Sequence, residues 1–366
     1  MEGRRGAASS PRGLRQRGLR ARWPAQASSS SSSSSCRGRG LRLSGFFIRL
    51  RRRRGVNPAP PVEVEVPRTR VYGGLVLGVV AVSWAAPLIR FAEAPSLAIS
   101  AWRLTFASVP LLALALVRGR SELTSLSART WGLLVLSGLA LALHFATWIA
   151  SLQYTTVASS VALVTTQPVW VTLFAWLALG ERVGPRGIAA LVLCLAGSVL
   201  IGARDFAAGG TALWGDLLAV AGAVMAGVYF VVGRRVRESM SLGTYVGIVY
   251  SVAAVALMVA HGFVDSPLTG FTPSTWMVLV GLALVPQLIG HSLLNASVRH
   301  LSAPFVAVAS LGEPVLSTLW AVPLLGEKPD WVQLVGGGLA LVGVLVMSRD
   351  EAARQPPPPD MVPAAD

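Results

Sequence analysis

The residue in this chain best placed to do chemistry is Glu313, a carboxylate about ten residues inside an apolar stretch, between Gly312 and Pro314. An ionised side chain at the centre of a bilayer costs roughly 2.5 to 3.5 kcal/mol, and such residues usually face a functional site. Pro314 removes a backbone donor and kinks a helix. A carboxylate beside a kink predicts a proton-coupling site, and a hydrogen bond that locks two helices is the alternative.

Arg103 and two histidines are further polar groups at membrane depth. The guanidinium of Arg103 offers paired donors that suit a substrate carboxylate. An ion pair with Glu93, or extension of the side chain toward the membrane surface, is the alternative. His144 and His291 occupy comparable places in the two halves of the chain, and each is either a proton relay or a helix contact.

Aromatic side chains recur on the stretches expected to line a pathway. Their ring faces can hold an apolar or cationic group of a substrate by stacking and cation–π attraction. The pathway candidates, together with the amide of Gln167, are Trp84, Trp148, Trp170, Tyr229 and Trp320. Four other tryptophans lie near the ends of stretches and are better explained as anchors at the membrane surface, namely Trp131, Trp214, Trp276 and Trp331.

Ten apolar stretches must position these side chains. Crossing the roughly 30 Å hydrocarbon core at 1.5 Å per residue takes about twenty helical residues, and each stretch is about that long. The stretches cover residues 72–92, 96–117, 130–151, 157–179, 186–203, 213–233, 242–261, 274–295, 303–325 and 331–348. Hydrophobic residues make up 53% of the chain and charged residues 13%. The sequence therefore predicts an all-α polytopic membrane protein with ten transmembrane helices.

The second five stretches repeat the first five at an offset of 146 positions. Three pairs of landmarks keep this offset: Gln167-Pro168 with Glu313-Pro314, Gly180-Glu181 with Gly326-Glu327, and Gly197 with Gly343. A repeat with an odd number of crossings enters the membrane in the opposite direction. This predicts two inverted five-helix repeats, residues 71–204 and 211–348, as in secondary transporters that bind substrates near the midplane. Pro168 and Pro314 would kink helices there.

The two ends of the chain differ from the apolar part. Residues 1–70 hold 17 Arg against three Glu, with eight consecutive serines from Ser28 to Ser35, which predicts a disordered basic tail. The tail could rest on anionic lipid headgroups, act as an organelle transit peptide, or be an unselected extension. Without a folded module beside it, it does not predict nucleic-acid binding. Residues 349–366, with Pro356 to Pro359, predict a second disordered tail.

The charges of the loops predict the orientation in the membrane. With the basic tail in the cytoplasm, nine loop arginines fall on the cytoplasmic side and three basic residues on the other, as the positive-inside rule requires. Ten crossings then return the C-terminus to the cytoplasm. The predicted location is a bacterial plasma membrane, multi-pass with both termini cytoplasmic. An organelle membrane is the alternative if the tail is a transit peptide.

Motifs for enzymatic chemistry are absent from the sequence. The chain contains no HExxH, GxSxG or Walker-type phosphate loop, so no residues are present for intramembrane hydrolysis or ATP-driven pumping by these routes. Cys36 lies in the tail and Cys194 in an apolar stretch, so neither a disulfide framework nor a thiolate metal site is predicted. We therefore expect no enzyme activity, no cofactor and no metal.

The landmark residues resemble those of a known family. Thr165-Thr166-Gln167-Pro168, Leu179-Gly180-Glu181 and Gly197 recur as Leu311-Gly312-Glu313-Pro314, Leu325-Gly326-Glu327 and Gly343, and Ser83-Trp84 and Ala101-Trp102-Arg103-Leu104 add to the pattern. This combination resembles the EamA-type transporters of the drug/metabolite transporter superfamily. The resemblance implies a ten-helix exporter of amino acids, metabolites or drugs, in many cases driven by protons. Gln167 departs from the family pattern, in which Glu often precedes the first proline.

The predicted function is a secondary transporter that exports small organic metabolites, amino acids or drugs, with proton coupling as an option. Its two repeats would rock about a central cavity. A nucleotide-sugar or sugar-phosphate exchanger is an alternative, although a phosphorylated substrate usually needs several inward cations and Arg103 is the one convincing candidate. A non-transporting membrane receptor or assembly factor is the alternative from another class. The predicted partners are a small-molecule substrate and the lipid bilayer, and a homodimer is left open.

Overall fold

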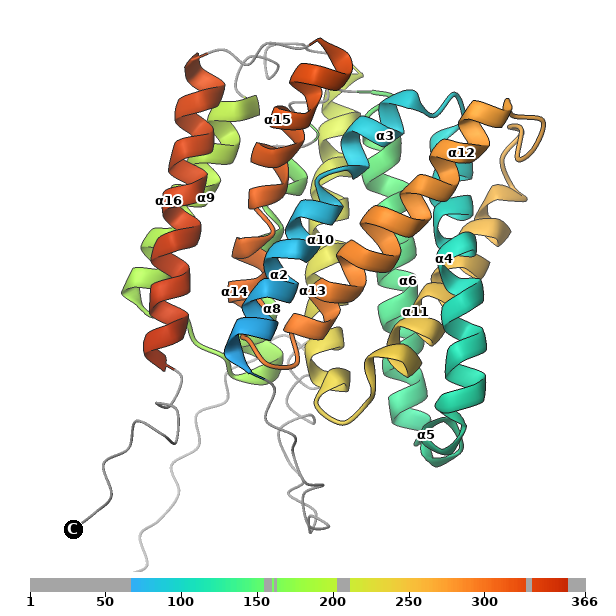
Figure 1. Cartoon of the computed structure of the whole chain (residues 1–366), viewed down its shortest axis with the longest axis horizontal. Coiled ribbons are helices and arrows are strands. Elements are labelled where there is room, and N and C mark those ends of the chain that lie inside the picture. The colour runs from blue at the N-terminus through green and yellow to red at the C-terminus, as the bar shows by residue number, and fades with distance from the viewer. Residues whose placement is uncertain (1–66, 155–159, 161–162, 203–210, 327–330, 355–366) are drawn as a thin grey trace, which may run out of the picture. The chain divides into compact units, whose positions relative to one another are not determined.

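The computed structural model describes residues 67–154, 160, 163–202, 211–326 and 331–354. Every regular element in these ranges is a helix, and all of them belong to one compact unit, Gly45–Asp366 (Figure 1). Residues 1–66 and 355–366, which make up most of the two predicted tails, lie outside the described residues. The helices extend slightly past both predicted tail boundaries, since the first described helix begins at Arg68 and the last ends at Arg354.

The first predicted repeat contains one interrupted helix and several continuous ones. Its described helices are α2 (Arg68–Val82), α3 (Ala85–Phe91), α4 (Ser96–Arg118), α5 (Arg120–Ser125), α6 (Ala128–Ser151), α8 (Gln167–Leu179) and α9 (Pro185–Gly202). α2 and α3 fill the first apolar stretch and are separated at Ser83 and Trp84. The Ser83 hydroxyl donates to the Val80 carbonyl at 2.6 Å, a contact of the kind that bends helices.

The second predicted repeat contains two interrupted helices. Its described elements are α10 (Ala212–Arg237), α11 (Leu242–His261), α12 (Pro273–Leu282), η2 (Ala283–His291), α13 (Ser292–Ser297), α14 (Ala303–Ala309), α15 (Gly312–Leu325) and α16 (Trp331–Arg354). η2 is a π-helical segment around Pro286 that joins α12 to α13 in one run. Such segments are frequent at functional sites. α14 and α15 are separated at Ser310 and Leu311, directly before Gly312.

Polar caps and glycines explain where several helices begin and end. The side chains of Ser127, Ser241, Thr272 and Ser302 accept a hydrogen bond from the N–H three residues later, at the starts of α6, α11, α12 and α14. Gly180 and Gly326 follow α8 and α15 with φ angles of 75° and 69°. Glycine adopts this left-handed conformation without a steric penalty and commonly ends helices in this way.

Seven helical runs among the described residues are long and apolar enough to cross a membrane. They are Arg68–Phe91, Ser96–Arg118, Ala128–Ser151, Leu213–Arg237, Leu242–His261, Pro273–Ser297 and Ala303–Leu324. Two shorter apolar helices, Gln167–Leu179 and Pro185–Gly197, fall within the predicted fourth and fifth stretches. The all-helical architecture is therefore confirmed, whereas the count of ten crossings stays a prediction.

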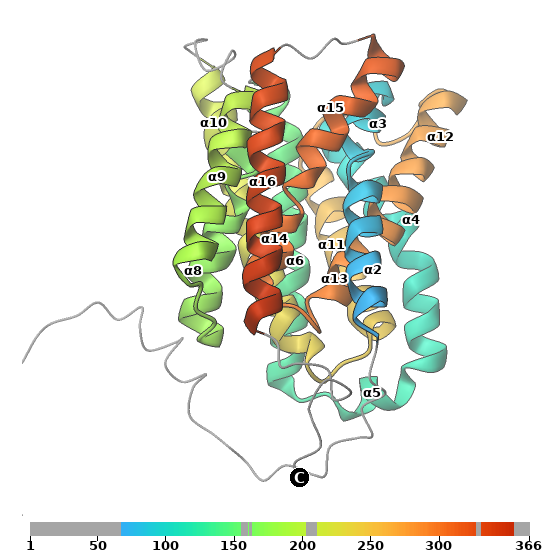
Figure 2. The ribbon, with the colours of Figure 1, turned by 60° about the vertical axis from the view of Figure 1, so that its left-hand side comes forward.

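Helices at equivalent positions of the two repeats pack against each other. α4 lies along α11, α9 along α16, and α8 against α14, while α6 packs on α10 and α2 packs on η2 and α13 (Figures 1 and 2). Exchanging the two repeats leaves this set of pairs unchanged, as a two-repeat plan requires. Both figures show the start of α2 and the end of α16 at the same end of the helices.

Glycine allows a close approach between α9 and α16. A Cβ atom on Gly343 would lie 2.4 Å from the Cys194 sulfur and 2.8 Å from the Ala190 carbonyl oxygen. Cys194 is fully buried there and packs as a small residue between the two helices. Small residues at such crossings let the two backbones approach closely. Van der Waals contacts then hold the helices together, because a bilayer supplies no hydrophobic driving force between them.

Candidate functional site

Arg103 is fully buried on α4 and forms the centre of the candidate site. Its Nε donates a hydrogen bond to Oε1 of Gln287 on η2 at 2.9 Å, and its Cζ lies 4.2 Å from the ring centre of Phe145 on α6. The same ring lies 5.4 Å from the ring centre of His291. A neutral acceptor and an aromatic face thus replace part of the hydration of the guanidinium. The side chain is thus enclosed by residues of α6 and η2.

Polar side chains from α10, α11 and α13 continue the site. The Asn295 Nδ2 donates to the Tyr229 hydroxyl and to the His291 carbonyl, the latter at 2.7 Å. The Tyr250 hydroxyl lies 3.4 Å from the Ser292 hydroxyl. These contacts connect three helices of the second repeat around Arg103 of the first. We define the central polar cluster as Arg103, Tyr229, Tyr250, Gln287, His291 and Asn295.

Four polar atoms of the central polar cluster are buried and have no hydrogen-bond partner among the described residues. They are Arg103 Nη1, Gln287 Nε2, His291 Nδ1 and Asn295 Oδ1. A buried polar group without a partner costs about 1–3 kcal/mol, and native proteins contain few of them. Their concentration in one cluster is therefore typical of a site that a ligand completes.

The sequence did not indicate three members of the central polar cluster in advance, namely Tyr250, Gln287 and Asn295. Gln287 and Asn295 stand four residues before and after His291, a spacing that places all three near one helix face. Polar residues at this spacing inside an apolar stretch are a signal that the sequence contains. Tyr250 has no comparable signal, because a tyrosine in an apolar stretch is common and its neighbours depend on packing.

His144 joins α6 to α10. Its Nδ1 lies 2.9 Å from the Gly222 carbonyl oxygen of α10, and its ring stacks on Trp148 with ring centres 6.0 Å apart. A Cβ atom on Gly222 would lie 3.2 Å from the Trp148 Cβ, so the helices are close at this point. The geometry matches the helix-contact alternative, and proton relay through His144 stays a prediction.

Glu313 lies in the first turn of α15, directly after the break between α14 and α15. Its carboxylate is partly buried, makes no hydrogen bond within the described part of the chain, and interacts electrostatically with Arg103. Free N–H groups at a helix start favour a negative charge. Gln167 and Pro168 occupy the corresponding place at the start of α8. Both proline sites therefore lie in the first turn of a helix.

The predicted pathway aromatics lie in separate contacts. Trp84 stacks on Trp320 with ring centres 4.7 Å apart, and Trp320 Nε1 donates to the Ser83 hydroxyl at 2.8 Å. This ties α15 to the interruption between α2 and α3. Trp170 lies on α8 with its ring centre 6.3 Å from that of Phe174, and its buried Nε1 has no partner among the residues described. Tyr229 joins the central polar cluster, whereas these tryptophans form other helix contacts.

A second polar group joins the two repeats at one end of the helices. The Glu181 carboxylate accepts hydrogen bonds from Arg234 Nε at 2.9 Å and from the Ala303 N–H at 3.1 Å. Arg234 Nη1 also donates to the carbonyls of Val298 and Arg299, at 2.9 and 2.8 Å. We call these five residues the Glu181 contact. It ties the α8–α9 connection to α10 and to the α13–α14 connection. Its counterpart in the repeat, Glu327, lies outside the described residues.

Glu122 of α5 makes a further contact, at the start of α11. Its carboxylate accepts from the Ser241 N–H at 3.1 Å and from the Ser241 hydroxyl at 2.7 Å. Partial burial by itself would raise the pKa of Glu122, but hydrogen bonds from Thr244 and Ser241 and the charge of Arg237 outweigh it. They hold the pKa below its ordinary value of 4.5. The ionised carboxylate therefore stabilises the contact between α5 and α11.

Comparison with known proteins identifies a family that matches the chain in two segments. The EamA-like transporter family matches residues 71–203 and 213–349. A pseudopaline exporter of Pseudomonas aeruginosa is 28% identical over 230 residues, which cover 62% of this chain and 78% of that protein. A probable terminal-alkyne amino-acid exporter of Streptantibioticus cattleyicolor is 30% identical over 200 residues, 53% of this chain and 64% of that protein.

An aromatic amino acid exporter of Ancylobacter novellus is 29% identical over 182 residues, 49% of this chain and 62% of that protein. A solved crystal structure matches the fold with a TM-score of 0.67 at 23% identity, and covers 79% of this chain and 100% of its own. The two family matches together span most of the chain. The chain therefore belongs to the EamA-like transporter family of the drug/metabolite transporter superfamily, and it is a multi-pass membrane transporter of small molecules, not an enzyme.

Proposed function

We propose that this transporter exports small organic molecules that carry a carboxylate and an amino group, such as amino acids and their derivatives. The central polar cluster would be their binding site. The observation that carries the proposal is Arg103, a fully buried guanidinium whose Nη1 is unpartnered among the described residues. Relatives named as exporters of amino acids and of pseudopaline support this class of substrate.

The unpartnered atoms define what a substrate would have to offer. Arg103 Nη1 and Gln287 Nε2 are donors, and they suit the two oxygens of a carboxylate. Asn295 Oδ1 is an acceptor and suits an ammonium group. The rings of Phe145 and Tyr229 can hold an apolar or cationic part of the substrate. A phosphorylated substrate fits less well, because Arg103 is the one guanidinium among the cluster's six residues.

Proton coupling is assigned to Glu313. It lies at a helix interruption that recurs at the corresponding place of the other repeat, and transporters bind substrates and ions at such interruptions. Protonation would remove a negative charge that interacts with Arg103. The affinity of Arg103 for a substrate carboxylate would then depend on the protonation state of Glu313.

The Glu181 contact supports alternating access by movement of the two repeats. Because it joins the repeats at one end, that end opens only when these hydrogen bonds break. We assign this end to the cytoplasm, since Arg234, Arg235 and Arg299 gather there. This orientation places both termini in the cytoplasm, with ten crossings of a bacterial plasma membrane.

Thermal unfolding of the purified protein with candidate substrates tests this function. A ligand that binds only the folded state raises the unfolding temperature. Apolar and aromatic amino acids should stabilise the parent but not Arg103→Gln. Arg129→Gln, at an exposed arginine on α6, should respond like the parent.

A milder variant separates binding from folding. Gln287→Glu keeps the size of the side chain and an acceptor for Arg103 Nε, but it replaces the Nε2 donor with an oxygen. It should fold and bind amino acids more weakly. Stabilisation by sugar phosphates would favour the exchanger alternative instead. Equal stabilisation of the parent and both cluster variants by amino acids would contradict the proposed site.

A further inference from the structure

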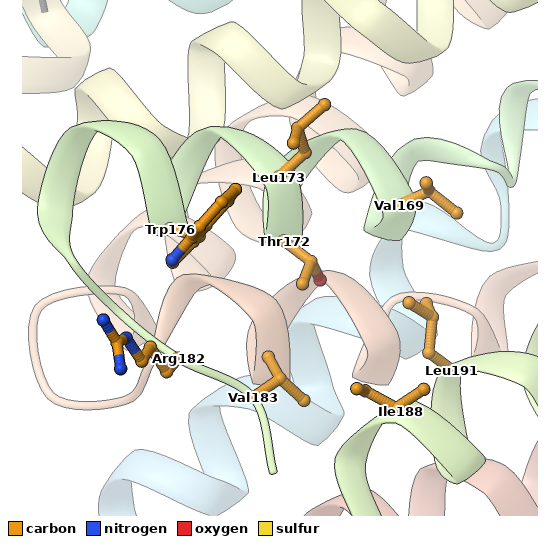
Figure 3. A pocket seen from close by; sticks show the side chains of 8 residues that line it. All are labelled: Val169, Thr172, Leu173, Trp176, Arg182, Val183, Ile188 and Leu191. Atoms are coloured by element: carbon orange, nitrogen blue, oxygen red, sulfur yellow. The ribbon is translucent and has the colours of Figure 1, made fainter. Parts of the chain in front are cut away.

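A groove of about 640 Å³ lies between α8 and α9, outside the central polar cluster (Figure 3). Val169, Thr172, Leu173 and Trp176 line it from α8, and Ile188 and Leu191 line it from α9. The connection between the helices adds Arg182 and Val183. The groove forms because the two consecutive helices have different partners, α10 and α14 for α8 and α16 for α9.

The walls of the groove are apolar and face outward. Leu173, Trp176 and Ile188 are 38%, 51% and 53% exposed. Exposed apolar surface of this kind marks an interaction with lipid or with another protein. Thr172 and Arg182 are the two residues with polar side-chain groups, besides the indole of Trp176, among the eight that line the groove.

The charge lies at one end of the groove. Figure 3 shows Arg182 and Trp176 together at one end, with Val169 and Leu191 toward the other. Tryptophan and arginine side chains both prefer the membrane–water interface. The 13 residues of α8 extend about 20 Å at 1.5 Å per residue, compared with roughly 15 Å for the hydrocarbon of one leaflet. The groove therefore runs from headgroup level toward the midplane.

We propose that this groove binds an anionic phospholipid. One acyl chain lies against the apolar walls, and the phosphate contacts the Arg182 guanidinium. Arginine recognises phosphate with paired hydrogen bonds, and basic pockets between transmembrane helices bind acidic headgroups. Arg186, exposed in the first turn of α9, adds a second positive charge near this end. A second copy of the chain fits less well, because it would take a cationic side chain out of water.

Native mass spectrometry of the full chain tests the proposal. The protein is extracted from vesicles of equal parts phosphatidylglycerol and phosphatidylcholine, and the lipids that stay bound are identified. The parent should retain phosphatidylglycerol in preference. The preference for phosphatidylglycerol should fall about fivefold in Arg182→Gln, because one arginine near anionic headgroups strengthens binding by about this factor. Thr172→Trp, which fills the groove and keeps Arg182, should also lose the bound lipid. Arg129→Gln should retain it like the parent.

Three results would overturn the proposal, provided that each variant elutes as a single species. The first is equal retention of both lipids by the parent. The second is unchanged retention of phosphatidylglycerol in Arg182→Gln and Thr172→Trp. The third is conversion of a dimer into a monomer by Thr172→Trp without loss of lipid, which would assign the groove to a second copy of the chain. The proposal does not rest on the exported substrate. The outcome of the lipid-retention experiment therefore says nothing about substrate binding, and the thermal-unfolding experiment says nothing about the lipid.

Discussion

Replacing Glu181 with glutamine should open one end of the transporter more often. The Glu181 carboxylate accepts two hydrogen bonds that join the repeats, from Arg234 Nε and from the Ala303 N–H. Glutamine keeps the length of the side chain and one acceptor oxygen, but it removes the charge. The variant should therefore fold, while the closed arrangement loses part of its stabilisation.

The size of this loss follows from the burial of the pair. A hydrogen bond to a charged group contributes about 1.5–3 kcal/mol, whereas an exposed ion pair contributes only about 0.2–1 kcal/mol. The side chains of Arg234 and Glu181 are 22% and 20% exposed, between these limits. We expect a loss of about 1–2 kcal/mol, which changes the ratio of closed to open molecules about 5- to 30-fold.

Labelling of a buried cysteine measures this ratio. Val298 is fully buried and takes part in the Glu181 contact through its carbonyl, so Val298→Cys should leave the contact intact. In a background without Cys36 and Cys194, an impermeant maleimide should label Val298→Cys about 5- to 30-fold faster when Glu181→Gln is present. Glu238→Gln is the control, since its ion pair with Arg235 is about half exposed. An unchanged rate in Glu181→Gln, or an equal rise in the control, would refute the reasoning.

Three further changes probe other parts of the structure. Glu313→Gln should keep substrate binding but lose the dependence of transport on a pH gradient, measured in vesicles, and a retained dependence would make Glu313 structural. Glu122→Gln should lower the unfolding temperature at pH 7. The folded pKa of Glu122 lies below 4.5, so the difference in unfolding temperature between the parent and Glu122→Gln should persist above pH 4.5. It should disappear as the pH falls through the folded pKa. A difference that stays constant over this range would contradict a stabilising role of the ionised Glu122 carboxylate. Gly343→Val should destabilise the protein by about 1–3 kcal/mol, because the new side chain would overlap Cys194. In the control Gly132→Ala, the added methyl group would have no other atom within 4 Å, so thermal unfolding should not change.

Much of the helical arrangement could be predicted from apolar length alone. The predicted stretches 96–117 and 242–261 agree with α4 (Ser96–Arg118) and α11 (Leu242–His261) almost residue for residue. Hydropathy does not report backbone irregularities, so the break at Ser83, the π-helical η2 and the surface helix α5 were not predicted. In the predicted stretch 157–179 the described helix α8 begins only at Gln167, after a turn at Thr166.

The site was predictable in part. A charged residue inside an apolar stretch has few explanations, and Arg103 was identified for that reason. Its partner Gln287 could not be identified in the same way, because a hydrogen bond across 184 positions depends on how two helices pack. The same limit applies to Glu181, which the sequence indicated only as a landmark of the repeat and which hydrogen-bonds across the two repeats in the structure.

Counterflow in reconstituted vesicles tests the central claim most directly. Vesicles are loaded with an amino acid that stabilises the purified protein, and uptake of the labelled compound is measured without a pH gradient. The parent and Arg129→Gln should exchange the compound, while Arg103→Gln, reconstituted to the same density, should fall to the rate of empty vesicles. Exchange by Arg103→Gln at the rate of the parent, or no exchange by the parent, would contradict transport through the central polar cluster.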